Sequence, residues 1–141
     1  MIIKWRKLHW VMMMFCVPAM PAFAKDGFME GAVRLLIDTD GKQHVQIRGG
    51  SYFFEPAHII ATANVPLEVL VTREWGIVPH TFVLEIPESG IRVDESLSMT
   101  PKTVIFTPTV IGRFEYYCRT KVPFFKTHGE KGMKGILEVV P

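Results

Sequence analysis

Four residues of the chain could together bind a metal ion. They are His80, Cys118, His128 and Met133, and they supply two imidazoles, one thiol and one thioether. Two imidazoles and a thiolate in one plane, with a weak axial thioether, are the donors of a mononuclear copper centre that carries single electrons. Soft sulfur favours Cu(I), whereas imidazole also suits Cu(II). These residue types therefore predict one copper ion that cycles between two oxidation states.

A leader at the start of the chain makes Cys118 unusual. Basic residues precede an apolar run that ends before Ala22-Phe23-Ala24, which is the pattern of a secretory signal peptide. We predict cleavage after Ala24, so that residues 1–24 are removed and the protein is periplasmic. No membrane span is expected after processing, because the apolar run is about half of the ~20 residues that a bilayer requires. Cys16 is lost with the leader, and Cys118 becomes the only cysteine.

Composition narrows the class of protein. The 141 residues are 48% hydrophobic and 21% charged, which excludes a disordered polyelectrolyte. The formal net charge is +2 without a basic stripe, so no nucleic-acid partner is expected. A lone cysteine in an oxidising compartment cannot form an intramolecular disulfide. Cys118 is therefore a buried thiol, an intermolecular bridge, a reactive thiol or a metal ligand.

Short β-strands are the elements that must position these residues. Apolar and polar residues alternate over runs that are bounded by turn residues, and His80 and Cys118 each lie in such a run. Asp38-Thr39-Asp40-Gly41 predicts a tight hairpin turn. Prolines leave room for a short helix at residues 88–97 or 122–132. We therefore expect an all-β sandwich of two antiparallel sheets with seven or eight strands.

From Ser51 to the C-terminus the chain resembles the cupredoxins, the family with the type 1 (blue) copper fold. The resemblance is carried by Phe54-Glu55-Pro56 with Val65-Pro66-Leu67-Glu68-Val69, by Val78-Pro79-His80-Thr81-Phe82, and by Phe114-x-Tyr116-x-Cys118 with the following His128 and Met133-x-Gly135. It implies a Greek-key sandwich for residues 51–141 and one type 1 copper held by His80, Cys118, His128 and Met133. Residues 25–50 are expected to form an N-terminal hairpin or extension. The subgroup of exported cupredoxins linked to copper tolerance is also indicated.

One departure from the family pattern concerns the last ligands. Nine residues separate Cys118 from His128, where the family has a handful or fewer. An enlarged loop would tilt Met133, and the axial ligand tunes the colour and the potential of such a site. If His128 is a mere loop residue, His58 is its replacement; otherwise His58 and His44 are structural. The alternative for Cys118, His80 and Met133 is ordinary core packing.

Two neighbouring features could tune the site. Trp75 packs either near the metal, where it would exclude water, or in the core. The apolar tract Val122-Pro123-Phe124-Phe125 either folds over the end of the sandwich or forms an exposed patch that docks a partner. The lysines that would rim this patch, and that would suit an acidic partner, are Lys121, Lys126, Lys131 and Lys134.

These observations predict a monomeric periplasmic protein that transfers single electrons. Its partner is a redox protein or a copper-handling protein. The alternative is copper tolerance or copper handling at the same site, which the ligands do not distinguish. The protein itself would fill all four metal positions, whereas a catalytic centre keeps one open, so we expect no enzyme. A Cys118 nucleophile with a histidine base, and a sandwich that only binds proteins, are the remaining alternatives.

Overall fold

Alternation of apolar residues along the chain produces strands, because successive side chains of a strand point to opposite faces. In β5 (Leu67–Arg73), Leu67, Val69 and Val71 are buried, and the residues between them are half-buried. The last strand, β10 (Lys134–Val140), repeats the pattern and buries Leu137 and Val139. The two-residue period that was read from the sequence therefore sets which face of each strand meets the core.

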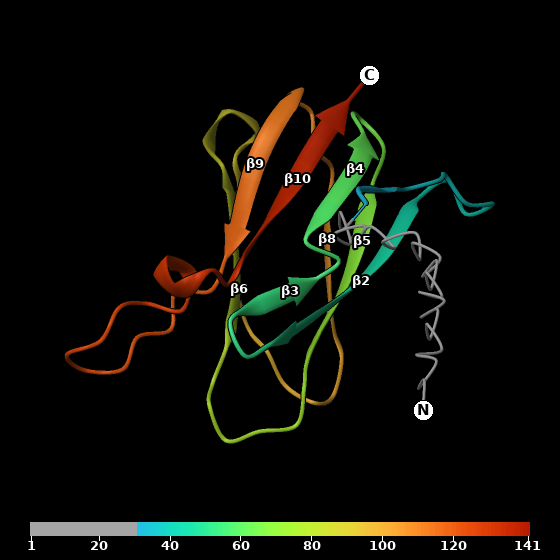
Figure 1. Cartoon of the computed structure of the whole chain (residues 1–141). Coiled ribbons are helices and arrows are strands. Elements are labelled where there is room, and N and C mark those ends of the chain that lie inside the picture. Colours follow the sequence, from blue (N-terminus) through green and yellow to red (C-terminus); the bar gives the residue numbers. More distant parts are fainter. Residues whose placement is uncertain (1–30) are drawn as a thin grey trace, which may run out of the picture.

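The computed structural model describes residues 31–141, which form two sheets (Figure 1). The first sheet contains, in spatial order, β1 (Val33–Arg34), β4 (His58–Thr62), β10, β9 (Gly112–Tyr117), β6 (Thr81–Ile86) and β7 (Ile91–Ser96). The second contains β3 (Phe53–Glu55), β2 (Gln43–Gly50), β5 and β8 (Lys102–Phe106). The predicted signal peptide lies outside the described residues. Within them, no helix has the length and apolar character to cross a membrane.

The predicted all-β sandwich is confirmed, but its details differ from the expectation. The described part of the chain has ten strands, not seven or eight. β1 and β3 have two and three residues, which is too short for an alternating pattern to reveal. Parallel pairs also occur, between β1 and β4, between β4 and β10 and between β2 and β5, in sheets that were expected to be antiparallel. These pairs follow from connections that cross between the sheets, which a strand-by-strand pattern does not record.

A helix over residues 88–97 was an incorrect expectation. The segment begins with a 3₁₀ turn, η1 (Pro87–Ser89), which ends at Gly90 in the left-handed conformation with φ 67°. β7 follows directly, and there Val93 is buried between exposed Arg92 and Asp94. Within residues 122–132 the helical structure is a second 3₁₀ turn, η2 (Gly129–Lys131). In both places a left-handed glycine stops the turn before an α-helix can form.

Residues 31–50 contribute to both sheets. The predicted turn is present: the Gly41 N–H donates to the Asp38 carbonyl at 2.9 Å, and the Asp38 N–H donates to the Lys42 carbonyl at 2.8 Å. Before this turn β1 pairs with β4, and after it β2 lies between β3 and β5. The segment that was expected as an N-terminal hairpin or extension thus contains an interior strand of the second sheet.

Aromatic rings and one buried amide tie the two sheets together. Phe54 makes edge-on contacts with Phe82 and Tyr116, at ring-centroid distances of 6.0 Å and 5.4 Å. Burial of each such side chain contributes about 1.5–3 kcal/mol. Gln43 is fully buried, and its side chain pairs with the backbone of Thr62, accepting from the N–H at 2.7 Å and donating to the carbonyl at 3.1 Å. Phe82 and Tyr116 are each two residues from a candidate ligand, so the aromatic contacts support that end of the sandwich, whereas Gln43 joins the sheets at the other end, where β2 begins and β10 ends.

Candidate metal centre

Pairing of the strands brings the candidate ligands to one end of the first sheet. His80 directly precedes β6, and Cys118 directly follows β9. The two strands are antiparallel neighbours, with Leu84 opposite Tyr116, so the start of β6 lies beside the end of β9. His128 and Met133 flank η2, immediately before β10, which also pairs with β9. Residues far apart in the sequence therefore meet where β6 and β10 begin and β9 ends.

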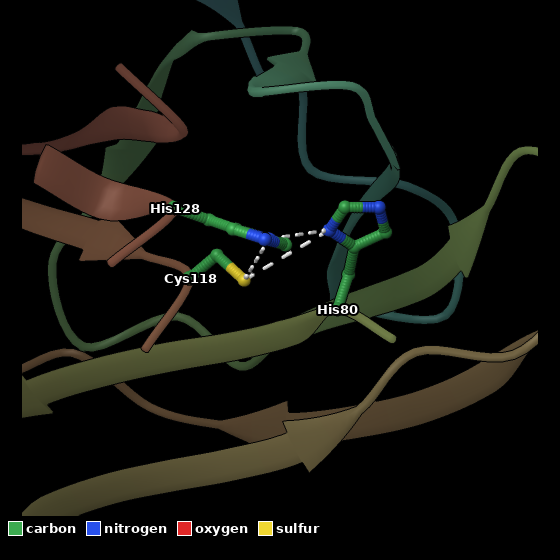
Figure 2. A group of neighbouring side chains, drawn as sticks. All are labelled: His80, Cys118 and His128. Atoms are coloured by element: carbon green, nitrogen blue, oxygen red, sulfur yellow. Dashed lines mark hydrogen bonds between the residues drawn. The ribbon is translucent and has the colours of Figure 1, made fainter. Parts of the chain in front are cut away.

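The donor atoms of three residues converge on one point (Figure 2). The Cys118 Sγ lies 3.7 Å from the His128 Nδ1 and 4.0 Å from the His80 Nδ1. The two Nδ1 atoms are 3.1 Å apart. All three side chains are buried, and no other group of three or more His, Cys, Asp or Glu residues in the described chain has its ligand atoms within 4.8 Å of one another. The triangle is the geometry that a small, soft cation needs.

Met133 is fully buried and is held by the backbones of two of these residues. Its N–H donates to the His128 carbonyl at 2.9 Å, and its carbonyl accepts from the Cys118 N–H at 3.1 Å. Its methyl end packs against β2, since a Cβ added at Gly49 would lie only 3.0 Å from the Met133 Cε. Met133 is thus anchored beside the cluster, and its role as the axial ligand stays a prediction.

Backbone hydrogen bonds bring His128 back to Cys118 in spite of the long spacing. The His128 N–H donates to the Thr120 carbonyl, and the Gly129 N–H donates to the Cys118 carbonyl, both at 2.9 Å. Lys121 and Thr127 form an isolated antiparallel bridge just outside this pair. Residues 121–127 therefore form a loop whose two ends are paired, called the excursion below, which leaves the sheet and returns to the same place. The extra residues lengthen the chain without lengthening the distance between the ligands.

Thr81 directs two hydrogen-bond donors at the cysteine sulfur, a role that was not predicted from the sequence. Its backbone N–H lies 3.3 Å from the Cys118 Sγ, and its hydroxyl lies 3.7 Å from the same atom. The hydroxyl oxygen also accepts from the Arg119 N–H at 3.0 Å. Its place directly after His80 was the available signal, because Thr81 begins β6 next to the end of β9, where Cys118 lies. Donors of this kind tune a metal–thiolate bond.

Burial lowers the pKa of both histidines. For His80 the largest cause is desolvation, followed by the nearby His128 and Arg73. For His128 the causes are desolvation and then the positive charge of Lys131. Both shifts favour the neutral imidazole, which is the form that binds a metal. The site is therefore poised for coordination near neutral pH.

Other residues singled out in the sequence lie apart from the cluster. His58 on β4 contacts Glu138, with 2.9 Å between its Nε2 and the carboxylate oxygen. His44 on β2 contacts Asp40 at 3.0 Å. Trp75 is 88% exposed, which excludes the core, one of the two places considered for it. Its segment forms part of the wall of a small hollow beside His80.

The donor set fits one copper ion. Two imidazoles and one thiol converge in a buried place, and a buried thioether is anchored next to them. Imidazole and thiolate are ligands that copper accepts in both oxidation states, whereas the hard cations magnesium and calcium require oxygen ligands. The chemistry of these residues is thus the one predicted from their types and order.

Comparison with known proteins gives matches to solved structures alone. No family model and no curated sequence matches the chain. The metal-binding domain of the Cu(I)-exporting P-type ATPase CopA of Streptococcus pneumoniae, solved with Cu(I), is 26% identical with a TM-score of 0.58, over 80% of this chain and 99% of that domain. Auracyanin B is 18% identical with a TM-score of 0.56, over 79% of this chain and 97% of that one. Auracyanin A, a "blue" copper protein of Chloroflexus aurantiacus, is 16% identical with a TM-score of 0.51, over 69% and 99%.

These similarities, together with the site, define the class of protein. The two mixed sheets match solved structures of cupredoxins over most of the described chain. The chain adds to this fold a buried cluster of His80, Cys118 and His128, with Met133 beside it. It is therefore a protein with the cupredoxin fold and a donor set for type 1 copper, as its sequence predicted.

Proposed function

We propose that this chain is a periplasmic type 1 copper protein that transfers single electrons. The observation that carries the proposal is the convergence of the Cys118 Sγ and the two Nδ1 atoms within 4.0 Å of one another. Bound copper would accept and release one electron as it cycles between Cu(II) and Cu(I). The leader-like pattern of residues 1–24 supports export.

Each residue has a role in holding the ion. His80, Cys118 and His128 bind it, and Met133 is the proposed weak axial ligand. Thr81 donates its N–H and hydroxyl toward the sulfur, which stabilises negative charge there. The core behind the site excludes water and limits rearrangement. Cys118 is fully buried, so a substrate has no access to its sulfur, and this supports a carrier rather than an enzyme that uses a cysteine nucleophile.

Copper titration tests the proposal directly. Adding Cu(II) to the purified protein should produce an intense visible absorption and the electron paramagnetic resonance spectrum of a copper–thiolate centre. Cys118→Ala should lose the absorption, because the colour arises from the bond between sulfur and metal. A protein that stays colourless in excess Cu(II) would exclude a type 1 site.

Copper handling at the same site is the second candidate. The observation that favours it is the likeness to the metal-binding domain of a Cu(I)-exporting ATPase, whose identity of 26% exceeds that of the two auracyanins above. A strain that lacks the gene separates the two roles. Sensitivity to copper with normal respiration indicates copper handling, whereas a respiratory defect with normal copper tolerance indicates electron transfer.

The excursion of residues 121–127 supports an exposed docking surface. Phe124 is fully exposed at its tip, with φ 66°, and Phe125 and Val122 are 60% and 45% exposed. Exposed apolar side chains beside a redox site are typical of a place where a partner docks. Lys121 and Lys126 are exposed at its rim, which suits an acidic partner, whereas Lys134 is paired with Glu115 at 3.1 Å. Replacing Phe124 and Phe125 by serine should preserve the copper spectrum and slow electron exchange with the partner.

A further inference from the structure

His128 is preceded by an exposed stretch of chain, yet its ring is held in a buried place. Residues 121–126 are all exposed, so no core packing on that side fixes the histidine. His80 and Cys118, in contrast, adjoin β6 and β9, two paired strands of the sheet. The position of His128 therefore requires another support within its own turn.

Thr127 and Glu130 supply that support through a reciprocal set of hydrogen bonds. The Glu130 N–H donates to the Thr127 Oγ1 at 3.1 Å, and the Thr127 N–H donates to the Glu130 Oε2 at 2.7 Å. The Thr127 hydroxyl also donates to the same carboxylate oxygen at 2.8 Å. This is the capping box, in which a threonine and a glutamate three residues later satisfy each other's backbone donors.

The backbone shows that His128 is the first residue of the capped turn. Its φ and ψ are −62° and −35°, which are helical values, and the Lys131 N–H donates to the Thr127 carbonyl at 3.2 Å. Because backbone torsions restrict the side-chain rotamer, a fixed first turn also restricts the direction of the imidazole. The edge-on contact of His128 with Tyr52, at 5.2 Å between ring centroids, then holds its other side.

We propose that the Thr127–Glu130 capping box is the device that positions the metal ligand His128, and that residues 122–126 are not needed for metal binding. The proposal rests on copper binding at the cluster. Thr127 and Glu130 do not touch the ion; they act through the backbone of His128. The capping box thus fixes the position of His128, as the paired strands β6 and β9 fix the positions of His80 and Cys118.

Disruptive and conservative variants test the capping box. Thr127→Val and Glu130→Ala should each weaken Cu(II) binding about 10- to 100-fold and change the resonance spectrum, as loss of a residue that orients a ligand does. Thr127→Ser and Glu130→Gln keep the required oxygens and should retain wild-type affinity and spectrum. Glu88→Ala is the matched control, because Glu88 is an exposed glutamate in the first turn of η1. It should change nothing.

A shortened loop tests the second half of the proposal. Replacing residues 122–126 by Asn-Gly leaves Lys121 and Thr127 joined by a tight hairpin turn and retains both halves of the capping box. Copper affinity should stay within about twofold of the wild type, because the bonds that return His128 to Thr120 and Cys118 are outside the deletion. A loss of tenfold or more would show that the excursion itself positions the ligand.

A measurement without metal separates this proposal from the proposed function. In the metal-free protein, nuclear Overhauser contacts between the rings of Tyr52 and His128 report the position of the imidazole. They should weaken in Thr127→Val and persist in Thr127→Ser, whether or not the wild type binds copper. Contacts and copper affinity that are unchanged in both Thr127→Val and Glu130→Ala would overturn the positioning role.

Discussion

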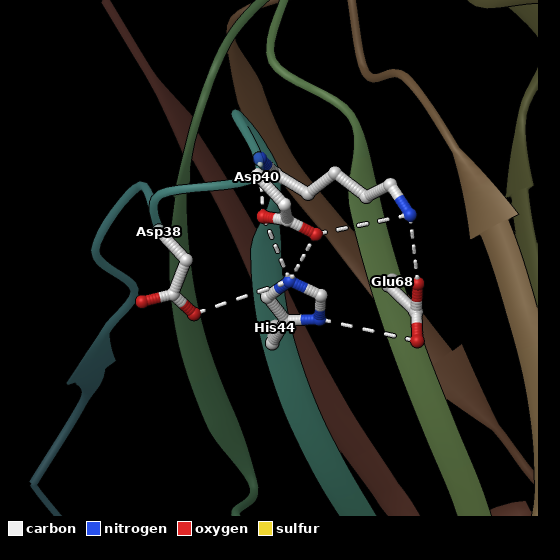
Figure 3. A network of polar contacts seen from close by, with 5 residues as sticks. Asp38, Asp40, His44 and Glu68 are labelled. Atoms are coloured by element: carbon white, nitrogen blue, oxygen red, sulfur yellow. Dashed lines mark hydrogen bonds and ion pairs between the residues drawn. The ribbon is translucent and has the colours of Figure 1, made fainter.

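One region of the molecule surrounds a single histidine with charged side chains, another brings two histidines together with a cysteine, and the two regions differ in almost every physical respect. On β2, His44 lies among carboxylates: its Nε2 is 3.0 Å from Asp40 and 3.9 Å from Asp38, and its Nδ1 is 3.9 Å from Glu68 (Figure 3). Lys42 joins the same group through Glu68 at 3.2 Å. At the other site, His80 and His128 face each other and a cysteine in a buried place.

The comparison shows which surroundings allow a histidine to bind a metal. Around His44, acceptors and a cation already pair with one another at the surface, where such pairs contribute little. The hydrogen bond from the Lys42 N–H and the contact with His44 even lower the pKa of Asp40, so the anion is satisfied without a metal. In the buried cluster, lone pairs converge on one another, and a soft cation is the partner that would satisfy all of them at once.

Removing one histidine from each region should give the largest contrast. His80→Ala should lower copper affinity by more than about 100-fold, which exceeds the effect of losing a residue that merely orients a ligand. His44→Ala, the matched control, should bind copper as the wild type does. Competition with a chelator of known affinity measures both. Equal losses in the two variants would mean that the buried cluster is not the site.

The second-largest expected effect is the loss of copper affinity at the buried cluster in acid. Burial depresses the folded-state pKa of His80 and His128 below the ordinary histidine value of 6.5, so both are neutral at pH 7 and able to bind metal. Copper affinity should fall as pH decreases below neutrality, because protons then compete for the same nitrogen atoms. Titration of the visible absorption with acid checks this.

The same shifts predict how stability of the metal-free protein depends on pH. A histidine with a depressed folded-state pKa binds its proton more readily in the unfolded chain. Its contribution to the free energy of unfolding is present above about pH 6.5 and is lost as pH falls through the folded-state value. Urea unfolding at pH 7.5 and pH 5 should show the decrease. Replacing both buried histidines should remove this part of the dependence, whereas replacing His44 should not.

A smaller effect is expected where β2 approaches Met133. A Cβ at Gly49 would lie 2.6 Å from the Leu97 Cδ1 and 3.0 Å from the Met133 Cε, so Gly49→Ala forces both side chains to shift. Such overpacking costs about 1–3 kcal/mol in the free energy of unfolding. Thermal unfolding measures that loss, and the resonance spectrum of the copper form measures any displacement of the proposed axial ligand. Gly41→Ala, in the distant turn where a Cβ meets no atom within 4 Å, controls for a general effect on stability.

The smallest predicted effect concerns the hydroxyl that faces the sulfur. Thr81→Val removes one donor to Cys118, and a donor stabilises the reduced site, which carries more negative charge. A net hydrogen bond of about 0.5–1.5 kcal/mol corresponds to a potential lower by roughly 20–60 mV for one electron. Cyclic voltammetry measures the shift, and Thr81→Ser should restore the wild-type value. A higher potential in Thr81→Val would contradict this assignment.

Residue types and local periodicity explain why the sequence could predict the donors and most strands. His80 and Cys118 adjoin strands with clear alternation. Few kinds of site other than a copper centre use sulfur and imidazole donors in that order. His128 was predicted as a ligand from its type and order, but the path by which it returns to Cys118 could not be predicted, because it depends on backbone bonds that any residues could make. The capping box corresponds to the sequence pattern Thr127-x-x-Glu130, but residues 122–132 were considered only as a possible short helix, and the first residue of that helix was not located. The two places considered for Trp75 could not be separated, because hydrophobicity alone does not distinguish a core residue from an exposed loop residue.

The position of the last strand has a consequence for how the protein is made. β10 is the last strand of the described residues but lies inside the first sheet, between β4 and β9. A chain that emerges from a ribosome or a translocation channel with its N-terminus first therefore presents His80 long before Cys118, His128 and Met133 follow. Until β10 joins the sheet, β4 and β9 have no shared neighbour, and His128 and Met133, which lie just before β10, are not held beside Cys118. Copper bound by all of these donors would thus require β10 to be in place.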